Sequence, residues 1–279
     1  MSNFKVDFMI IGAGKSGTTS LFSWLDEHPN LVGASNKEPH FFSTHPDWRS
    51  GIEEYEKLFI KQREVLYFEA STSYTYYPHR NLFIWEDLFE FNPKMKFIYL
   101  VRNPLERFIS HYMHSYERGY TNLSLSDSIL NDHKTLDVSR YSTQILPFIE
   151  RFGRENVLIL DFDDLKENPK NILKTVCVFL SIDAAPIDSM NTIAENKSLS
   201  KQRRHHKYDS PPFYMKVLYR LARPVWNKIV DNSKRSFTKR PQLTEVDKRL
   251  LLSLLRTDIL QLEKIMNKDL SHWISIDGK

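Results

Sequence analysis

The segment from Met9 to Leu21, MIIGAGKSGTTSL, constrains the fold of this chain more than any other. An apolar run that fits a buried strand ends in Gly12-Ala13-Gly14, and apolar residues then recur at helical spacing. A strand, a tight glycine turn and a helix start direct backbone N–H groups and the positive end of a helix dipole at one point. This pattern favours a bound phosphate over an ordinary strand-to-helix turn capped by Ser or Thr.

The side chains of this segment also suit a phosphate. Lys15 adds a mobile positive charge, and the hydroxyl groups that follow are hydrogen-bond donors. The predicted phosphate-binding residues are Gly14, Lys15, Ser16, Gly17, Thr18, Thr19 and Ser20.

A nucleoside-triphosphate P-loop is the first alternative. Its pattern G-x-x-x-x-G-K-[ST] requires a glycine where this chain has Met9, so the loop is too short to wrap a β-phosphate. A kinase or NTPase also needs a magnesium-binding carboxylate at a nearby strand end. The strand 96–101 is followed by Arg102 instead, but the strand 157–160 is followed by Asp161, which leaves this alternative open.

Strands and helices alternate along the chain and are joined by short loops. This order predicts an α/β fold, a P-loop-like, doubly wound parallel sheet flanked by helices. The predicted extended segments are 7–11, 31–34, 65–69, 96–101 and 157–161. The predicted helices are 19–28, 51–59, 82–91, 104–117, 139–152 and 169–180, and loops are expected at 35–43 and 70–78.

The C-terminal part differs in composition. Between Lys197 and Arg240 there are thirteen Lys or Arg and two Asp, a net charge of +11, while the whole chain carries +4. We interpret residues 1–279 as one domain with a basic helical tail, in which 191–241 is a basic segment and 243–268 an amphipathic helix. The basic block indicates either an anionic ligand, acceptor or surface, or a solvated basic helix without a partner.

Composition bears on the cellular compartment in which the protein is expected. The single cysteine, Cys177, excludes an internal disulfide, so nothing requires an oxidising compartment. No uncharged run is long enough for a transmembrane helix, and the N-terminus leads directly into the first strand. We therefore expect a cytoplasmic protein, with a peripheral position at the inner membrane surface as an option. We identify no cluster with metal-ligand spacing.

A second anion site is predicted around Arg102, at the carboxyl end of an apolar strand, where open α/β sheets bind ligands. Asn103 suits the N-cap and Pro104 the first position of the next helix. Arg107 and Ser110 follow one and two turns later, so both can share a face with the helix start. The alternative is a surface arginine paired with a neighbouring acid.

Glu38 and His40 lie in the predicted loop between these two sites. If the loop is extended, the two side chains face the same way. A carboxylate near a cationic site can act as a general base, and His40 could orient it. Residues 69–74 follow another strand and would line the same cleft. Without other signals, a solvated acid and a structural histidine would be the better interpretation.

These motifs together resemble the sulfotransferases that use 3′-phosphoadenosine 5′-phosphosulfate (PAPS), in the branch that includes heparan sulfate sulfotransferases and bacterial relatives. Residues 12–19 are similar to the 5′-phosphosulfate loop of that family, and residues 36–42 to the segment with its catalytic glutamate and histidine. Residues 102–110 are similar to its 3′-phosphate site. Lys239 and Arg240 are similar to a basic loop that closes over the nucleotide.

The resemblance implies transfer of a sulfuryl group from PAPS to a hydroxyl or amine, with release of the 3′,5′-bisphosphate PAP and without a metal. It implies catalytic roles for Glu38, Lys15 and His40, and nucleotide contacts from Arg102 and Ser110. Ala70 and Ser43 stand where glycosaminoglycan-modifying members often carry a lysine and an acid.

The acceptor is predicted only by class: a glycan, a glycolipid or a small metabolite. The basic tail could hold a carbohydrate or lie on an anionic membrane beside a lipid-linked acceptor. Nucleic-acid binding lacks an accompanying motif and is not expected. A kinase or NTPase and a basic binding module without catalysis remain the rival hypotheses.

Overall fold

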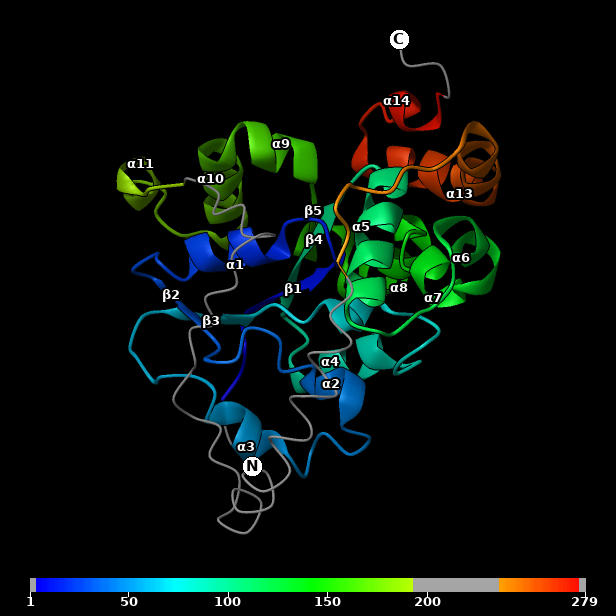
Figure 1. Cartoon of the computed structure of the whole chain (residues 1–279). Coiled ribbons are helices and arrows are strands. Elements are labelled where there is room, and N and C mark those ends of the chain that lie inside the picture. The colour runs from blue at the N-terminus through cyan, green and yellow to red at the C-terminus, as the bar shows by residue number, and fades with distance from the viewer. Residues whose placement is uncertain (1–3, 193–235, 276–279) are drawn as a thin grey trace.

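The structure is a computed structural model, and it describes residues 4–192 and 236–275. Five parallel strands form one sheet in the order β2-β3-β1-β4-β5 (Figure 1). The strands are β1 (Phe8–Gly12), β2 (Leu31–Gly33), β3 (Leu66–Glu69), β4 (Lys96–Val101) and β5 (Val157–Asp161). The predicted parallel α/β sheet is confirmed, and each predicted extended segment coincides with a strand to within two residues.

The register of the sheet brings the carboxyl ends of its strands to one edge. Phe8 is the partner of Phe68 on β3 and of Lys96 on β4, and Phe97 is the partner of Val157 on β5. The loops after β1, β3 and β4 therefore start side by side, which is where ligands bind in sheets of this type.

Two apolar cores cover the two faces of the sheet, because successive residues of a strand point to opposite faces. Phe8, Ile10 and Ile98 belong to the core that also contains the buried side chains of α1 (Thr18–Leu25) and α10 (Pro169–Leu180). Met9 and Phe97 belong to the other core. That core is closed by α4 (Ile84–Phe91), α5 (Pro104–Glu117), α8 (Tyr141–Phe152) and α13 (Glu245–Met266).

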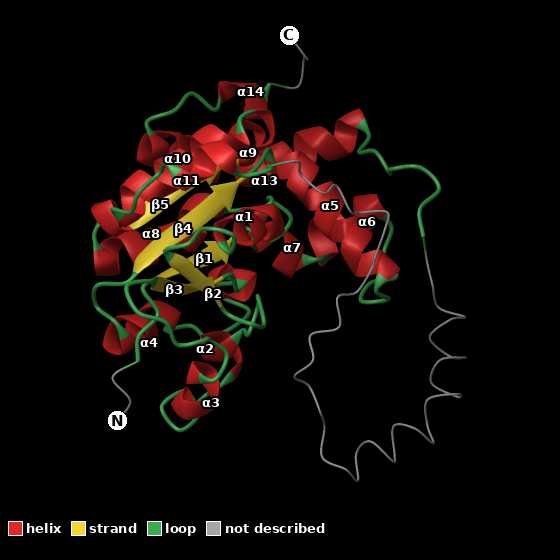
Figure 2. Ribbon diagram, turned by 90° about the vertical axis from the view of Figure 1, so that its left-hand side faces the viewer, coloured by secondary structure: helices red, strands yellow, loops and turns green. Residues whose placement is uncertain are grey.

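The yellow strands of Figure 2 run between these helical layers. The remaining helices within residues 4–192 and 236–275 are short. They are α2 (Phe41–Thr44), α3 (Ile52–Glu56), α6 (Leu125–Asn131), α7 (His133–Asp137), α9 (Phe162–Glu167), α11 (Pro186–Ser189) and α14 (Ser271–Ile274), with 3-10 turns η1 (Thr72–Thr75) and η2 (Arg154–Asn156).

Several of these short elements differ from the sequence-based expectation. Helix α2 begins inside the loop predicted at 35–43, η1 lies in the loop predicted at 70–78, and α6 and α7 were not predicted. Helices of four to seven residues show too little of the helical period to be recognised. One signal did exist, since the Ser124 hydroxyl accepts a hydrogen bond from the Asp127 N–H and caps α6.

The C-terminal helix agrees with its prediction. Thr244 and Asp247 form a reciprocal capping box at its start, and α13 ends before Asn267. The basic segment predicted at 191–241 lies mostly outside the described residues. Among the residues that the structure describes, no helix combines the length and apolar character needed to cross a lipid bilayer.

Candidate active site

The loop between β1 and α1 has the geometry of an anion cradle. Lys15 and Gly17 both have left-handed φ angles, of 75° and 88°, and Gly17 is the N-cap of α1. A side chain at Gly17 would approach Phe162 to 2.9 Å, so both space and conformation require glycine there. A Cβ at Gly14 would lie 3.2 Å from the Tyr76 hydroxyl. Both glycines therefore keep the loop compact, and the unpaired N–H groups of the first turn of α1 give its N-terminus the geometry of an anion site.

The predicted phosphate-binding side chains of this loop do not all face outward. Lys15 and Thr19 are exposed, and Ser20 is half-buried. Ser16 is fully buried and its N–H donates to the Ala13 carbonyl at 3.2 Å, so its hydroxyl and amide are both turned inward. Thr18 is 5 % exposed and begins α1, where its N–H belongs to the first helical turn.

Arg102 joins the two predicted anion sites. Its Nη1 donates to the Lys15 carbonyl at 3.2 Å, and its Nη2 lies 3.4 Å from Glu106 Oε2. The guanidinium also lies over the ring of Phe162, 4.7 Å from its centroid. The Asn103 side chain caps α5, with Pro104 in the first turn, as the sequence predicts. Arg102 is therefore held beside the glycine loop by three independent contacts.

Arg240 reaches the same place from the other end of the chain. Its Nη2 donates to Glu106 Oε2 at 2.6 Å, so one carboxylate oxygen is shared by Arg102 and Arg240. Phe237 packs on Tyr116 of α5 with ring centroids 5.0 Å apart, which fixes this segment along the helix. Arg240 thus lies beside Arg102, while Lys239 is exposed, and their predicted contact with a nucleotide stays a prediction.

Ser110 lies on α5 and is half-buried. Its helical spacing puts it on the face that also carries Glu106 and Glu117. Glu106 on this face contacts Arg102, which in turn donates to the Lys15 carbonyl, and the charge of Glu117 favours the ammonium form of Lys15. Desolvation has the larger effect and, together with Arg102, Arg107 and Arg118, lowers the pKa of Lys15.

Arg107 does not share the exposed face with Ser110, contrary to the sequence-based expectation, because its side chain is completely buried. Its Nη2 donates to the Thr135 carbonyl and to Ser139 Oγ, both at 2.6 Å. Its Nη1 lies 3.4 Å from the Gly14 carbonyl and 3.3 Å from His111 Nδ1. None of these described partners is a carboxylate, so the glycine loop has a buried cation directly behind it.

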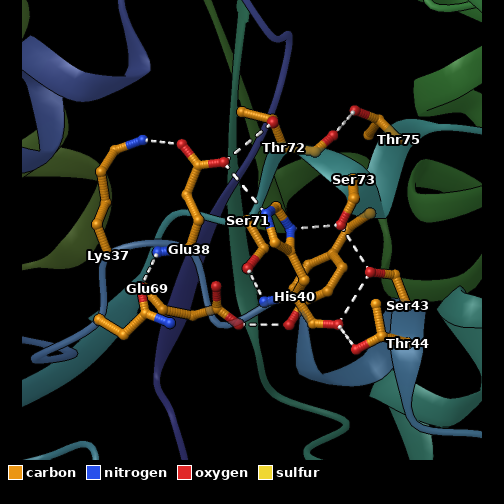
Figure 3. Close-up of polar contacts among 12 residues, drawn as sticks. Lys37, Glu38, His40, Ser43, Thr44, Glu69, Ser71, Thr72, Ser73 and Thr75 are labelled. Atoms are coloured by element: carbon orange, nitrogen blue, oxygen red, sulfur yellow. Dashed lines mark hydrogen bonds and ion pairs between the residues drawn. The ribbon is translucent and has the colours of Figure 1, made fainter. Parts of the chain in front are cut away.

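Glu38 and His40 come together, as predicted, but not through an extended loop. His40 has a left-handed φ of 55° and starts α2, and its Nε2 lies 3.5 Å from Glu38 Oε2 (Figure 3). The Thr72 hydroxyl donates to the same oxygen at 3.4 Å. Lys37 Nζ lies 2.5 Å from the other oxygen, Oε1. Both oxygens of the Glu38 carboxylate therefore have partners, Lys37 at Oε1 and Thr72 and His40 at Oε2.

The serines after β3 orient His40. Its backbone N–H donates to Ser71 Oγ at 2.8 Å, and its ring Nδ1 shares a hydrogen bond with Ser73 Oγ at 2.7 Å (Figure 3). Burial lowers the pKa of His40, and the attraction of Glu38 only partly opposes this. The imidazole is therefore neutral at physiological pH. Residues 69–74 line the site as expected, but their role as a support for His40 was not predicted.

Comparison with known proteins decides the family. The sulfotransferase domain model matches residues 5–211, well over half of the chain. The chain belongs to the sulfotransferase family. Its fold is similar to that of a crystal structure of a sulfotransferase from Alicyclobacillus acidocaldarius, with a TM-score of 0.68 and 22% identity, covering 98% of this chain and 100% of that one.

Curated relatives of this sulfotransferase include enzymes of heparan sulfate. It is 29% identical over 191 residues to mouse heparan sulfate glucosamine 3-O-sulfotransferase 5, covering 62% of this chain and 53% of that protein. It is 25% identical over 200 residues to the bifunctional heparan sulfate N-deacetylase/N-sulfotransferase 1 of Caenorhabditis elegans, covering 66% and 23%. The chain thus spans about half or less of the length of these relatives.

Asp161 bears on the kinase or NTPase alternative. In this sulfotransferase the carboxylate is 4 % exposed, and its Oδ2 accepts a hydrogen bond from Lys268 Nζ at 2.7 Å. Its Oδ1 accepts from the Asp163 N–H and caps α9. Both oxygens are engaged in structural contacts, so Asp161 is not placed as the magnesium ligand that a nucleoside triphosphatase would need.

Glu69 is a buried acid beneath the His40 loop of the sulfotransferase. Its Oε1 accepts hydrogen bonds from the hydroxyls of Tyr74 at 2.5 Å and Tyr55 at 3.1 Å. Burial raises the pKa of Glu69 from 4.5 to about 7, although hydrogen bonds from Ser71, Tyr74 and Tyr55 act in the opposite direction. The side chain supports the aromatic cluster under the site.

The raised pKa of Glu69 makes stability pH-dependent. Its contribution is fully present below the unfolded-state value near 4.5 and is lost as the pH rises through about 7. The amide in Glu69→Gln cannot titrate. Between pH 4.5 and 7 the unfolding free energy of wild type should therefore fall by about 3 kcal/mol relative to that of the variant. Urea unfolding at both pH values measures this. Parallel pH profiles, like those expected of the exposed-site control Glu54→Gln, would contradict it.

Proposed function

We propose that this sulfotransferase transfers a sulfuryl group from PAPS to a hydroxyl or amine of an acceptor. The observation that supports it best is the contact of Arg102 with the Lys15 carbonyl, which joins a glycine-loop anion site to a second cationic site. A nucleotide with phosphates at both its 5′ and 3′ ends requires two such sites. The identity of the donor also rests on the family to which the chain belongs.

The described residues fit this donor. The buried guanidinium of Arg107 has no carboxylate among its described partners, and an uncompensated buried charge is costly. An anion bound at the glycine loop would compensate it. A Cβ at Gly14 would crowd the Tyr76 hydroxyl at 3.2 Å, so glycine lets the loop keep its compact course, and the N–H groups of the first turn of α1 are donors for that anion. In this proposal Thr18, Thr19 and the Gly17 N–H hold the 5′-phosphate, and Arg102 and Ser110, with the Arg240 segment, hold the 3′-phosphate.

The proposed reaction breaks the bond between sulfur and the bridging phosphate oxygen and forms one between sulfur and the acceptor atom. Glu38 accepts the acceptor proton, and Lys15 stabilises the charge that develops on the departing oxygen. His40, held by Ser71 and Ser73, orients the carboxylate. PAP leaves with the electron pair of the broken bond. Positioning and electrostatics carry most of the catalysis, as in phosphoryl transfer.

We further propose that the acceptor is a glycan, a glycolipid or a small metabolite. Two of its curated relatives are named for heparan sulfate, which supports a carbohydrate. We also propose that residues 1–279 act as one domain. This is supported by the buried side chains of α13, such as Leu251 and Leu255, which belong to the same apolar core as β1 and β4.

Calorimetry tests the donor directly. Wild type should bind PAP in preference to ATP with magnesium, and Arg102→Ala should weaken PAP binding about tenfold, by about 1.5 kcal/mol. We expect an effect at the low end of the range for charge-assisted hydrogen bonds, because Arg240 remains beside Glu106 and still supplies a positive charge at this place. Arg49→Ala, whose guanidinium pairs with Glu90 elsewhere, is the matched control. Preference for ATP would support a kinase, and binding of neither nucleotide would support a basic binding module.

A further inference from the structure

A polar cavity of about 440 Å³ lies next to the proposed reaction centre. Its walls come from α5, from the segment between α5 and α6, from Asn131 and Asp132 at the junction of α6 and α7, from α7, and from Tyr76 after η1. This volume is within the range of about 300–1,000 Å³ that is usual for small-molecule sites. None of its lining residues has a role in the proposed binding of the donor.

Two walls connect the cavity to the reaction centre. A Cβ built on Gly14 would lie 3.2 Å from the Tyr76 hydroxyl and 3.7 Å from Thr72 Oγ1, so both side chains border the glycine loop. The Thr72 hydroxyl in turn donates to Glu38. On the opposite wall, His111 contacts the buried Arg107 behind the glycine loop. The cavity therefore shares Tyr76 with the surroundings of the glycine loop and His111 with the buried Arg107.

The lining is rich in hydroxyl groups and carries balanced charge. Tyr76, Ser115, Tyr120, Thr121 and Thr135 contribute hydroxyls. The aliphatic part of the lining is Leu123 alone.

Lys134 is the cation of the lining and Asp132 its acid. The Lys134 ammonium lies over the ring of Tyr76, 4.9 Å from its centroid. Both Asp132 oxygens accept hydrogen bonds from Thr135, at 3.0 and 2.6 Å. Burial and the charge of Arg107 lower the pKa of His111, which is therefore neutral.

Tyr120 marks the mouth of the cavity. Its side chain lines the cavity and is nevertheless 74% exposed, whereas aromatic rings of soluble proteins are mostly covered. Its position is fixed through the backbone, since the Tyr120 N–H donates to the Ser115 carbonyl at 2.8 Å. An exposed ring beside hydroxyl groups offers a flat apolar face and polar partners at once.

We infer that this cavity binds the sulfate acceptor, and that the acceptor is a neutral polyhydroxylated molecule of about one or two sugar rings. The inference rests on the proposed function. A hydroxyl-rich wall satisfies a polyol, whereas a flat phenol would need a more apolar wall. A strongly anionic chain would need several cations, and the lining supplies one, balanced by an acid. Tyr120 would cover the apolar face of the first ring.

Saturation-transfer NMR on the PAP-bound protein tests the ligand class. The probes are lactose as a neutral polyol, glucuronic acid as an acidic sugar and 4-nitrophenol as a flat phenol. We expect lactose to give the strongest transfer, and Tyr120→Ala to reduce it severalfold. Ile60→Ala, which changes a 70% exposed side chain outside the cavity, should leave it unchanged. Stronger transfer to either other probe, or none to lactose, would overturn the inference.

Blocking the cavity tests its location. The natural Cys177 is fully buried, so Asn131→Cys on the wall can be labelled selectively with a bulky methanethiosulfonate. The label should abolish lactose binding and leave PAP binding intact, while the same label on Asn122→Cys, outside the lining, should affect neither. Lactose binding that survives the label at Asn131 would overturn the inference. If unlabelled wild type does not bind PAP at all, the proposed function is wrong. Failure of the acceptor inference and failure of the proposed function therefore give different results.

Discussion

Replacing Glu38 with Gln is expected to lower the turnover number by about 10²–10⁴-fold, the usual contribution of a positioned general base. The amide keeps the shape of the side chain and can still contact Thr72, but it cannot accept the acceptor proton. The affinity for PAP should stay close to that of wild type, because Glu38 has no place in the proposed donor site. Radiolabelled sulfate transfer from PAPS and calorimetry with PAP measure the two quantities separately.

Glu54→Gln, at an exposed position of α3, is the control for Glu38→Gln and should be fully active. If Glu38→Gln also keeps full activity, the assignment of the base is wrong. His40 would then be the first candidate, because its Nε2 is the nearest described imidazole nitrogen to the same carboxylate. If His40 is the base, His40→Asn should show the large loss of turnover that Glu38→Gln does not show.

Arg107→Met is expected to weaken PAP binding about 30-fold, although Arg107 is buried behind the loop and has no contact with the proposed ligand. A unit charge about 8 Å from an anion contributes about 2 kcal/mol at the effective dielectric constant of a protein. Methionine is unbranched and apolar and removes the charge, but it is shorter than arginine and removes the donors to the Thr135 carbonyl and Ser139 Oγ, so two control variants are needed. Thermal unfolding with and without PAP measures the effect, because the stabilisation by a ligand depends on its affinity.

Two further variants distinguish this electrostatic role from a purely structural one. Arg107→Lys keeps the charge and should recover part of the PAP affinity. Ser139→Ala removes an acceptor of two Arg107 hydrogen bonds and should lower the stability of the free protein, while PAP binding remains close to wild type. A PAP-induced stabilisation of Arg107→Met equal to that of wild type would show that the buried cation contributes nothing to the donor site.

Local sequence patterns were sufficient for the elements that depend on short-range rules. The strand, glycine turn and helix from Phe8 to Leu25 follow from an apolar run and from glycine at a left-handed position. The Asn103 cap and the capping box at Thr244 follow from residue type and spacing alone. The sequence also indicated that Glu38 and His40 lie together if their loop is extended; they do lie together, but His40 has a left-handed φ instead.

The contacts that join distant segments could not be predicted in this way. Nothing near Arg107 in the sequence indicates that it is buried against the Gly14 carbonyl, whereas Arg102, five residues earlier, remains partly accessible. The bridge from Arg240 to Glu106 joins residues 134 positions apart. The cavity combines Tyr76 with residues of α5 and α7.

By itself, the sequence determined the parallel α/β frame and the type of anion that its glycine loop suits, because turn chemistry and apolar periodicity act over a few neighbouring residues. Only the tertiary structure decided which arginine stays partly accessible beside the glycine loop, which one is buried behind it, and which segments surround the cavity. Those outcomes depend on how α5, α7 and the loops after β1 and β3 pack together, and packing is a property of the whole fold.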